Sequence, residues 1–104
     1  MSIPNTPLHR LTRVAASAAL FGSPCRVFAI LLNGGSTASS LKLTNDANGS
    51  GTAVINVVAQ FTDNDASAAD CTFVDFTSLG GIEFSSKCYA TIAGTSAEAF
   101  IWWD

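Results

Sequence analysis

The sequence predicts an all-β protein: an antiparallel β-sandwich or jelly-roll-like fold with an extended N-terminal arm. Three observations predict it. Short apolar runs recur along the chain, several of them alternate apolar and polar residues, and clusters of Gly, Asn, Asp and Ser separate them. A chain of 104 residues can build one modest core but not two. We therefore expect an arm over residues 1–13 and a single sandwich domain over residues 14–104.

The N-terminal part of the chain contains two different patterns. Residues 1–9 (MSIPNTPLH) are polar and include Pro4 and Pro7, which predicts an extended segment without a core of its own. Residues 10–21 fit either an Ala-rich helix or an alternating strand, and the Gly-Ser-Pro run at 22–24 ends the element in both cases. Because the rest of the chain is rich in strand patterns, we expect a strand.

Two strands are expected next. Residues 25–32 (CRVFAILL) form the most apolar run, which is typical of a central strand buried on both faces. Residues 38–44 alternate, so that Leu41 and Leu43 point to the core. The outward positions of this strand are expected to be Ser40, Lys42 and Thr44.

The middle of the chain predicts a loop and three further strands. Residues 45–51 are rich in turn formers, and residues 52–61 follow as a strand. One face of that strand should carry Ala53, Ile55, Val57 and Ala59. Two short strands are expected at residues 71–76 and 81–84.

The last eighteen residues predict a β-hairpin that organises the fold. Two apolar runs flank Gly94-Thr95-Ser96, a sequence typical of a tight turn. In the second run, Phe100 and Trp102 alternate with Ile101 and Trp103. Exposing so much aromatic area to water would be unfavourable, so we expect the terminal strand to lie inside a sheet or against a partner.

The composition favours a protein that associates with other proteins. Apolar residues make up 48% of the chain and charged residues 12%, about half the usual charged share. So few charges predict that much of the surface is covered by other subunits. The net charge is −3 and the five basic residues are scattered, which argues against a nucleic-acid partner. The sequence has no run of about 20 apolar residues, so we expect no membrane-spanning helix. Residues 14–23 do not fit the pattern of a secretory signal peptide.

Cysteine usage does not indicate a disulfide framework. Cys25, Cys71 and Cys88 are odd in number and have no CxxC spacing. We expect buried, reduced thiols that act as small apolar groups in a reducing cytosol. A single disulfide between two of the three is the alternative.

No pattern predicts catalysis, a cofactor or a metal ion. Asp63, Asp65 and Asp70 form the one acidic cluster, but the segment lacks the glycine and the oxygen ligands of a calcium loop, which favours a solvated loop. His9 is the only histidine and lies in the expected arm, so we expect a surface or interface residue. We therefore predict a non-enzymatic protein with no catalytic, cofactor-binding or metal-binding residues.

The aromatic residues near the C-terminus allow two interpretations. Alternating aromatic side chains most often form core on one face and a subunit contact on the other. The alternative is a stacking platform for sugars or bases. These residues are Tyr89, Phe100, Trp102 and Trp103.

The overall pattern resembles a group of phage proteins. A proline-bearing polar start is followed by CRVFAILLNGGS, SLKLTNDANGSGT and GGIEFSSKCYATIAGTSAEAFIWWD. Over about residues 25–104 this is similar to small β-sandwich structural proteins of tailed bacteriophages. The resemblance implies a virion component: a capsid cement (decoration) protein, often a trimer that clamps neighbouring capsid subunits, or a part of the tail, fibre or baseplate. It implies no catalytic residues.

The resulting functional hypothesis is a capsid cement protein. Under this hypothesis we expect the protein to be made in the host cytoplasm, to lie on the outer capsid surface of the virion, to form a homotrimer and to bridge subunits of the major capsid protein. We expect no nucleic acid or membrane partners. Residues 1–13 are expected to contact the capsid, and the exposed face of the C-terminal hairpin to contact other subunits. The alternative is a tail, fibre or baseplate component that binds a carbohydrate or receptor through Tyr89 and Trp102 or Trp103. A small secreted adhesin is a weaker third hypothesis.

Overall fold

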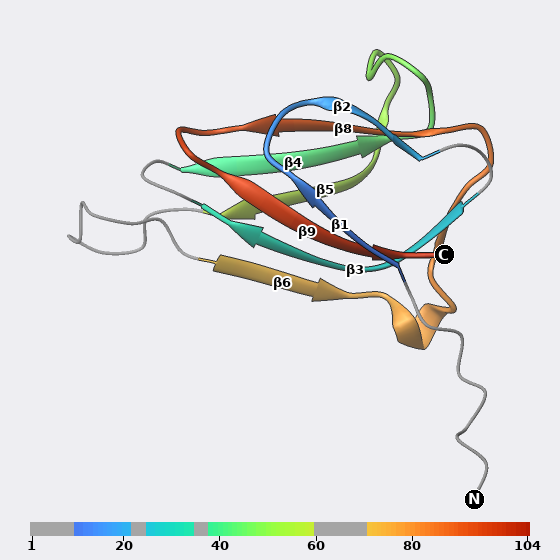
Figure 1. Ribbon diagram of the computed structural model, residues 1–104. Helices are drawn as coiled ribbons and strands as arrows, with labels where there is room; N and C mark the ends of the chain where they lie inside the picture. Colours follow the sequence, from blue (N-terminus) through green and yellow to red (C-terminus); the bar gives the residue numbers. More distant parts are fainter. Residues whose placement is uncertain (1–9, 22–24, 35–37, 60–70) are drawn as a thin grey trace, which may run out of the picture.

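The computed structural model describes residues 10–21, 25–34, 38–59 and 71–104. Within these ranges the chain forms two antiparallel sheets packed face to face (Figure 1), which confirms the predicted fold class. The strands are β1 (Arg10–Val14), β2 (Ala18–Phe21), β3 (Cys25–Asn33), β4 (Ser39–Thr44), β5 (Ala53–Ala59), β6 (Cys71–Asp75), β7 (Ile82–Phe84), β8 (Cys88–Ala93) and β9 (Glu98–Trp103). A 3₁₀ turn, η1 (Thr77–Leu79), precedes β7. No helix in the described ranges has the length and apolar character needed to cross a bilayer.

The strand order is that of a jelly roll. Sheet A has the order β1-β9-β3-β6, and sheet B has the order β2-β8-β4-β5. β7 also belongs to sheet A, where it pairs with the first residues of β3 on the same side as β6. The pairs are nested: β1 with β9, β2 with β8, β3 with β6, and β4 with β5. A long antiparallel ribbon of eight strands rolled into two sheets gives this nesting. β7 is an addition to it.

The core lies between the two sheets and consists mainly of aliphatic side chains, with the ring of Phe84 and the thiols of Cys25 and Cys88 among them. Alternation along each strand sends every second side chain inward, as the pleat requires. Each large apolar side chain that is fully buried stabilises the fold by about 1.5–3 kcal/mol relative to exposure. The largest fully buried apolar side chains are Phe84, Ile30, Leu32, Leu41, Leu43, Ile101 and Val27.

Two strand predictions from the middle of the chain are confirmed. β3 is central in sheet A as predicted, with β9 on one side and both β6 and β7 on the other. It is not buried on both faces, because Arg26 is exposed and Leu31 is only partly buried. Leu41 and Leu43 of β4 are fully buried, and Ile55 and Val57 of β5 point to the same core.

Thr44 departs from the predicted alternation. It was expected to point outward but is fully buried, because the register of β4 shifts between Leu43 and Thr44. Its hydroxyl donates a hydrogen bond to Asp46 Oδ1 (3.0 Å), which compensates for its burial.

The single strand expected over residues 10–21 is divided between the two sheets. β1 belongs to sheet A and β2 to sheet B, and residues 15–17 cross between them. The Ser17 hydroxyl oxygen accepts the backbone N–H of Ile92 (3.0 Å), so a side chain replaces a ladder bond at this corner. Residues 10–13, which the predicted arm included, therefore belong to β1 of sheet A. Residues 1–9 lie outside the described residues.

The predicted C-terminal hairpin is also wrong. β8 lies in sheet B between β2 and β4, and β9 lies in sheet A between β1 and β3. The segment from Gly94 to Ala97 crosses from one sheet to the other, so Ala90 and Ile101 face a common core instead of lying side by side. Alternation shows which side chains point inward but not which strand supplies the hydrogen bonds. The prediction that the terminal strand is internal is confirmed, because β9 has a partner on each side.

Candidate functional site

The outer face of sheet A carries apolar side chains from four strands. Two rows of side chains cross it in register. Phe100 and Leu31 lie between Arg13 and Phe73 in one row, and Trp102 and Ala29 lie between Leu11 and Asp75 in the other. We call the following six residues the apolar face: Leu11, Ala29, Leu31, Phe73, Phe100 and Trp102.

The apolar face is exposed to solvent on its two outer strands, and two of its aromatic rings pack against each other. Leu11 on β1 is 55% exposed and Phe73 on β6 is 58% exposed. The rings of Phe73 and Trp102 pack edge to face, with centroids 6.1 Å apart and planes at 83°. This is a favourable aromatic geometry, and it ties β6 to β9 across the intervening β3. Exposed apolar patches of this kind mark interaction surfaces.

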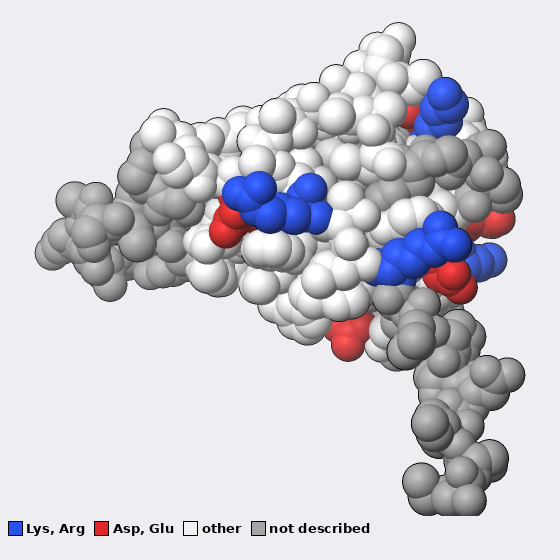
Figure 2. All heavy atoms as spheres, viewed as in Figure 1, with Lys and Arg blue, Asp and Glu red and all other residues white. Residues whose placement is uncertain are grey.

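Charged residues border the apolar face on opposite sides. On the β1 side, Arg13 Nε and Nη2 each lie 2.7 Å from Glu98 Oε2. On the β6 side, Asp75 Oδ1 accepts hydrogen bonds from the hydroxyl (2.7 Å) and backbone N–H (2.9 Å) of Thr77. These two bonds outweigh desolvation and lower the pKa of Asp75. In the view of Figure 2, most of the described surface is uncharged and the charges form a few small groups of mixed sign.

The outer face of sheet B differs in chemistry. Its central row consists of Thr91, Lys42 and Asn56, which is typical of a solvated sheet face. Its large exposed apolar side chains, Val54 (46%) and Val58 (44%), both lie on the edge strand β5. The outer face of sheet B therefore serves as a control surface for substitutions on the outer face of sheet A.

The structure separates the aromatic residues that the sequence grouped. Tyr89 belongs to sheet B, where a Cβ added to Gly49 would lie 2.7 Å from its ring, so the ring packs over the 45–51 loop. Trp103 is on the inward side of β9, its Nε1–H donates to Thr12 Oγ1 (2.9 Å), and the Arg10 guanidinium lies 5.1 Å from its ring centroid. A platform joining Tyr89 to Trp102 or Trp103 is therefore not formed.

Trp102 is paired instead with Phe73, which sequence reasoning missed as a site residue. The alternation in CTFVDF could have placed Phe73 on an outer face, but nothing local indicates that β6 lies on β3. The exposed face expected for the C-terminal hairpin is likewise divided. Phe100 and Trp102 belong to the apolar face, whereas the outward residues of β8 belong to sheet B.

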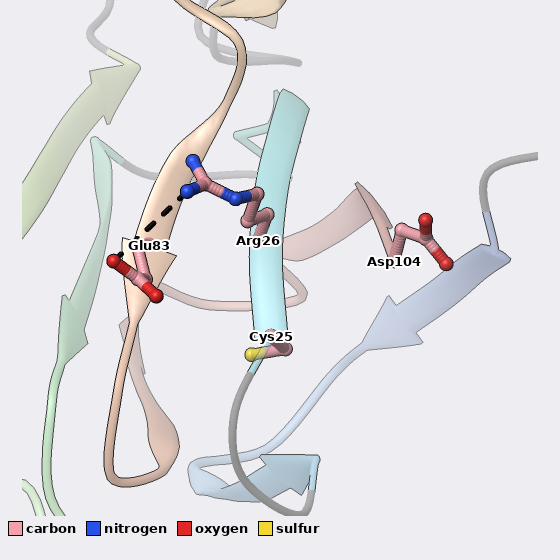
Figure 3. A pocket seen from close by; sticks show the side chains of 4 residues that line it. All are labelled: Cys25, Arg26, Glu83 and Asp104. Atoms are coloured by element: carbon pink, nitrogen blue, oxygen red, sulfur yellow. Dashed lines mark ion pairs between the residues drawn. The ribbon is translucent and has the colours of Figure 1, made fainter. Parts of the chain in front are cut away.

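A pocket of about 210 Å³ lies at the start of β3, lined by Cys25, Arg26, Glu83 and Asp104 (Figure 3). Arg26 forms a surface ion pair with Glu83 (4.0 Å), while Asp104 lies on the other side of β3 and points away. The backbones of Arg26 and Asp104 exchange two hydrogen bonds of 2.9 Å, which extend the sheet. Burial raises the pKa of the Cys25 thiol, so it is protonated and a poor nucleophile. The pocket therefore lies where β3, β7 and the residue that follows β9 are held together, and its lining residues have a structural role.

The three cysteines are free thiols, and they divide by burial. Cys25 and Cys88 are buried, as expected for small apolar groups, whereas Cys71 is exposed on β6, contrary to the expectation. Desolvation, and secondarily the neighbouring Cys25, raises the pKa of Cys88 to about 12. Because only the thiolate is nucleophilic, the buried pair should resist modification.

We expect one fast-reacting thiol per folded chain. An aromatic disulfide reagent added to dilute protein in mildly alkaline solution should modify Cys71 quickly, and all three cysteines only after unfolding. Replacing Cys71 with serine should remove the fast phase and leave the slow one. A fast phase of two or three thiols in the folded protein would contradict the burial of Cys25 and Cys88.

Asp46 organises the loop between β4 and β5. Its Oδ1 accepts the backbone N–H of Gly49 (2.6 Å), and its Oδ2 accepts that of Gly51 (2.7 Å). Partial desolvation acts to raise the pKa of Asp46, but these bonds, with others from Thr44 and Asn48, outweigh it and lower the pKa. The carboxylate is therefore a structural anion that holds the loop.

This arrangement predicts an acid-sensitive loop. With its folded-state pKa below the ordinary value of 3.8, Asp46 stabilises the fold fully above that value, and the contribution disappears as the pH falls through the lowered pKa. Asp46→Asn should lower the thermal midpoint at neutral pH and reduce the further loss in acid. Thermal unfolding followed by circular dichroism over a pH series measures both effects, with Asp104→Asn as the control. Equal acid sensitivity in the Asp46→Asn variant and the unmodified protein would contradict this role.

The other candidate residues weighed in the sequence are not placed. His9, Asp63, Asp65 and Asp70 lie outside the described residues. Within the described ranges, no group of three or more His, Cys, Asp or Glu side chains is arranged to hold a metal ion.

Comparison with known proteins yields no match to a family model, a curated protein or a solved structure.

Proposed function

We propose that this protein is a non-enzymatic virion component of a tailed bacteriophage, most specifically a capsid cement protein. In this role it forms a homotrimer on the outer capsid surface and bridges subunits of the major capsid protein. The observation that favours it is the apolar face, an uncharged surface that extends across sheet A from β1 to β6. Such a surface suits permanent contacts between proteins better than contact with water.

The fold and the composition support the same proposal. Jelly rolls are used by viral capsid domains and also by lectins, so the fold alone does not separate these functions. The rigid sandwich and the low charge of 12% suit a part that is held between other subunits. The capsid contact expected for residues 1–13 includes Arg10 to Arg13 of β1, which is an edge strand of sheet A.

The test is to locate the protein on purified virus particles that carry its gene. Mass spectrometry should find the chain in the particle, and gold-labelled antibodies should decorate the head. Label on the tail would favour the alternative function, and absence from particles would overturn the proposal. A second assay adds the purified protein to capsids that lack it, where we expect saturable binding. Removing residues 1–9, which leaves β1 intact, should weaken that binding without changing the circular dichroism spectrum.

The alternative is a tail, fibre or baseplate component that binds a carbohydrate or receptor. One observation favours it: Trp102 and Phe73 form an ordered aromatic pair on an open sheet face, and sugar rings stack on such surfaces. Titration with host surface glycans, followed by tryptophan fluorescence, separates the two functions. A saturable shift that is lost in Trp102→Ala supports glycan binding, and the absence of a shift supports the cement role.

A further inference from the structure

The sequence contains two Asn-Gly pairs, and the structure places them in different surroundings. Asn33-Gly34 lies at the end of β3, and Asn48-Gly49 lies in the loop between β4 and β5. An asparagine followed by glycine can lose its side-chain amide, because a glycine has no Cβ to hinder attack of its backbone nitrogen on the asparagine Cγ. Since the dipeptide is the same in both places, the surrounding structure decides which pair reacts.

The first pair is held in sheet A on both sides. Asn33 pairs with Cys71 of β6 and with Glu98 of β9. The Cys71 thiol lies 3.7 Å from Asn33 Oδ1, so the side chain points towards a neighbouring strand. Gly34 is buried, and its carbonyl accepts the Ser39 hydroxyl (2.6 Å). The extended backbone therefore cannot turn Gly34 N towards Asn33 Cγ without breaking the ladder.

The side-chain amide of Asn48, in contrast, is oriented by two donors. Its Oδ1 accepts the backbone N–H (3.0 Å) and the hydroxyl (2.7 Å) of Ser50. This Asx turn folds the side chain over the Gly49 peptide, so that Asn48 Cγ faces Gly49 N. Oδ1 is also the atom that gains negative charge when Cγ is attacked, and two donors aimed at it stabilise that charge. Asn48 is exposed, so water can reach it.

A carboxylate faces the attacking nitrogen. Gly49 N–H donates to Asp46 Oδ1 at 2.6 Å, within the reach of a general base. Gly51 N–H donates to Asp46 Oδ2 (2.7 Å) and fixes the orientation of the carboxylate. The attacking nitrogen, an acceptor for its proton and two donors for the developing oxyanion are therefore held together before any reaction, which lowers the entropic part of the barrier.

We propose that Asn48 is a site of self-catalysed deamidation, assisted by Asp46 and Ser50. Gly49 N forms a bond to Asn48 Cγ, the proton of that nitrogen passes through Asp46 to Asn48 Nδ2, and the Cγ–Nδ2 bond breaks to release ammonia. Water then opens the resulting succinimide at either carbonyl, which leaves aspartate or isoaspartate at position 48. The product adds one negative charge to a net charge of −3, in the loop that already holds Asp46. This modification goes beyond the proposed function and does not depend on it.

The first test follows the intact chain during incubation at neutral pH. Peptide mapping by mass spectrometry detects each conversion as a gain of about 1 Da. In the folded protein we expect Asn48 to convert at least about tenfold faster than Asn33, and faster than Asn48 itself converts in concentrated urea. In urea the two pairs should convert at similar rates, because neither is held. Equal rates at the two pairs in the folded protein, or a slower reaction of Asn48 in the fold than in urea, would overturn the inference.

The second test removes the assisting groups one at a time. Ser50→Ala deletes the hydroxyl donor and should slow conversion by about three- to tenfold, less than in a buried oxyanion hole because the loop is solvated. Asp46→Asn keeps an acceptor for Gly49 N–H but cannot take its proton, so it should slow conversion as well. The matched control is Ser78→Ala in η1, an exposed serine remote from the loop in sequence, which should leave the rate unchanged.

Circular dichroism at the incubation temperature checks that each variant is folded. Ser50→Ala keeps both bonds from Asp46 to the loop, so its result decides the question if Asp46→Asn lowers stability. Conversion in Ser50→Ala as fast as in the unmodified protein would show that Ser50 only shapes the loop, and faster conversion in a folded Asp46→Asn variant would show that Asp46 only restrains it. Either result would overturn the assisted reaction.

Discussion

Gly94→Ala should lower the free energy of unfolding by about 2–5 kcal/mol, the sum of backbone strain and overpacking. Gly94 lies in the segment that crosses from β8 to β9 and has a φ of 123°, a conformation that residues with a Cβ rarely adopt. An added Cβ would also lie 2.8 Å from Ser39 Cβ and 3.1 Å from Ser39 Cα. The Ser39 hydroxyl donates to the carbonyl of Gly34 (2.6 Å), so this neighbour is held in place. In thermal unfolding, we expect the midpoint to fall by about 10–25 °C.

Gly80→Ala is the matched control for this substitution. Gly80 also has a positive φ, 76°, but a Cβ there would meet nothing within 4 Å. The Gly80→Ala variant should therefore lose about 1 kcal/mol from backbone strain alone, without the steric overlap that a Cβ meets at Gly94. If the two variants unfold at the same temperature, the close approach of Gly94 to Ser39 does not determine stability.

Phe84→Ala is expected to cost about 3–5 kcal/mol, the range for a buried aromatic side chain replaced by alanine. Phe84 is fully buried and is the largest such side chain in the core. It belongs to β7, a strand of three residues that pairs with the start of β3, so little backbone is available to fill the cavity. Urea unfolding at low protein concentration should show a lower midpoint with an unchanged dependence on denaturant.

The control is the same substitution at the surface. Phe73 is 58% exposed, so Phe73→Ala should change the free energy of unfolding of the dilute protein by less than about 1 kcal/mol. The same change should weaken self-association if the apolar face meets another copy. A large loss of stability in the dilute Phe73→Ala protein would show that this ring is part of the fold and not of an interface.

Local patterns predicted the direction of side chains well and the partners of strands poorly. Leu41, Leu43, Ile55 and Val57 are buried as their alternation indicates, because the pleat fixes the period at two. The hairpin at Gly94 was wrong because a glycine-containing turn between two strands is compatible with one sheet or with a crossing between two. Long-range pairing decides between them, and it has no local signal.

For the candidate site too, the direction of side chains could be predicted from the sequence and the pairing of strands could not. Phe100 and Trp102 share a face by alternation alone, so two of the three aromatic residues of the apolar face could be grouped from the sequence. Phe73 joins them only because β6 pairs with β3, which in turn pairs with β9. The exposure of Cys71 was missed for the same reason, since Cys71 lies on the outward side of an edge strand whose place in the sheet is not encoded nearby.

The nested pairing of β1 with β9 also affects biosynthesis. β9 is made after the other eight described strands, yet it is the neighbour that both β1 and β3 need in sheet A. A nascent chain that stops before β9 has two unjoined strand edges and an incomplete core, so the fold closes only after β9 has left the ribosome. Contacts between such distant residues also slow the search for the native pairing, and we expect refolding in milliseconds to seconds.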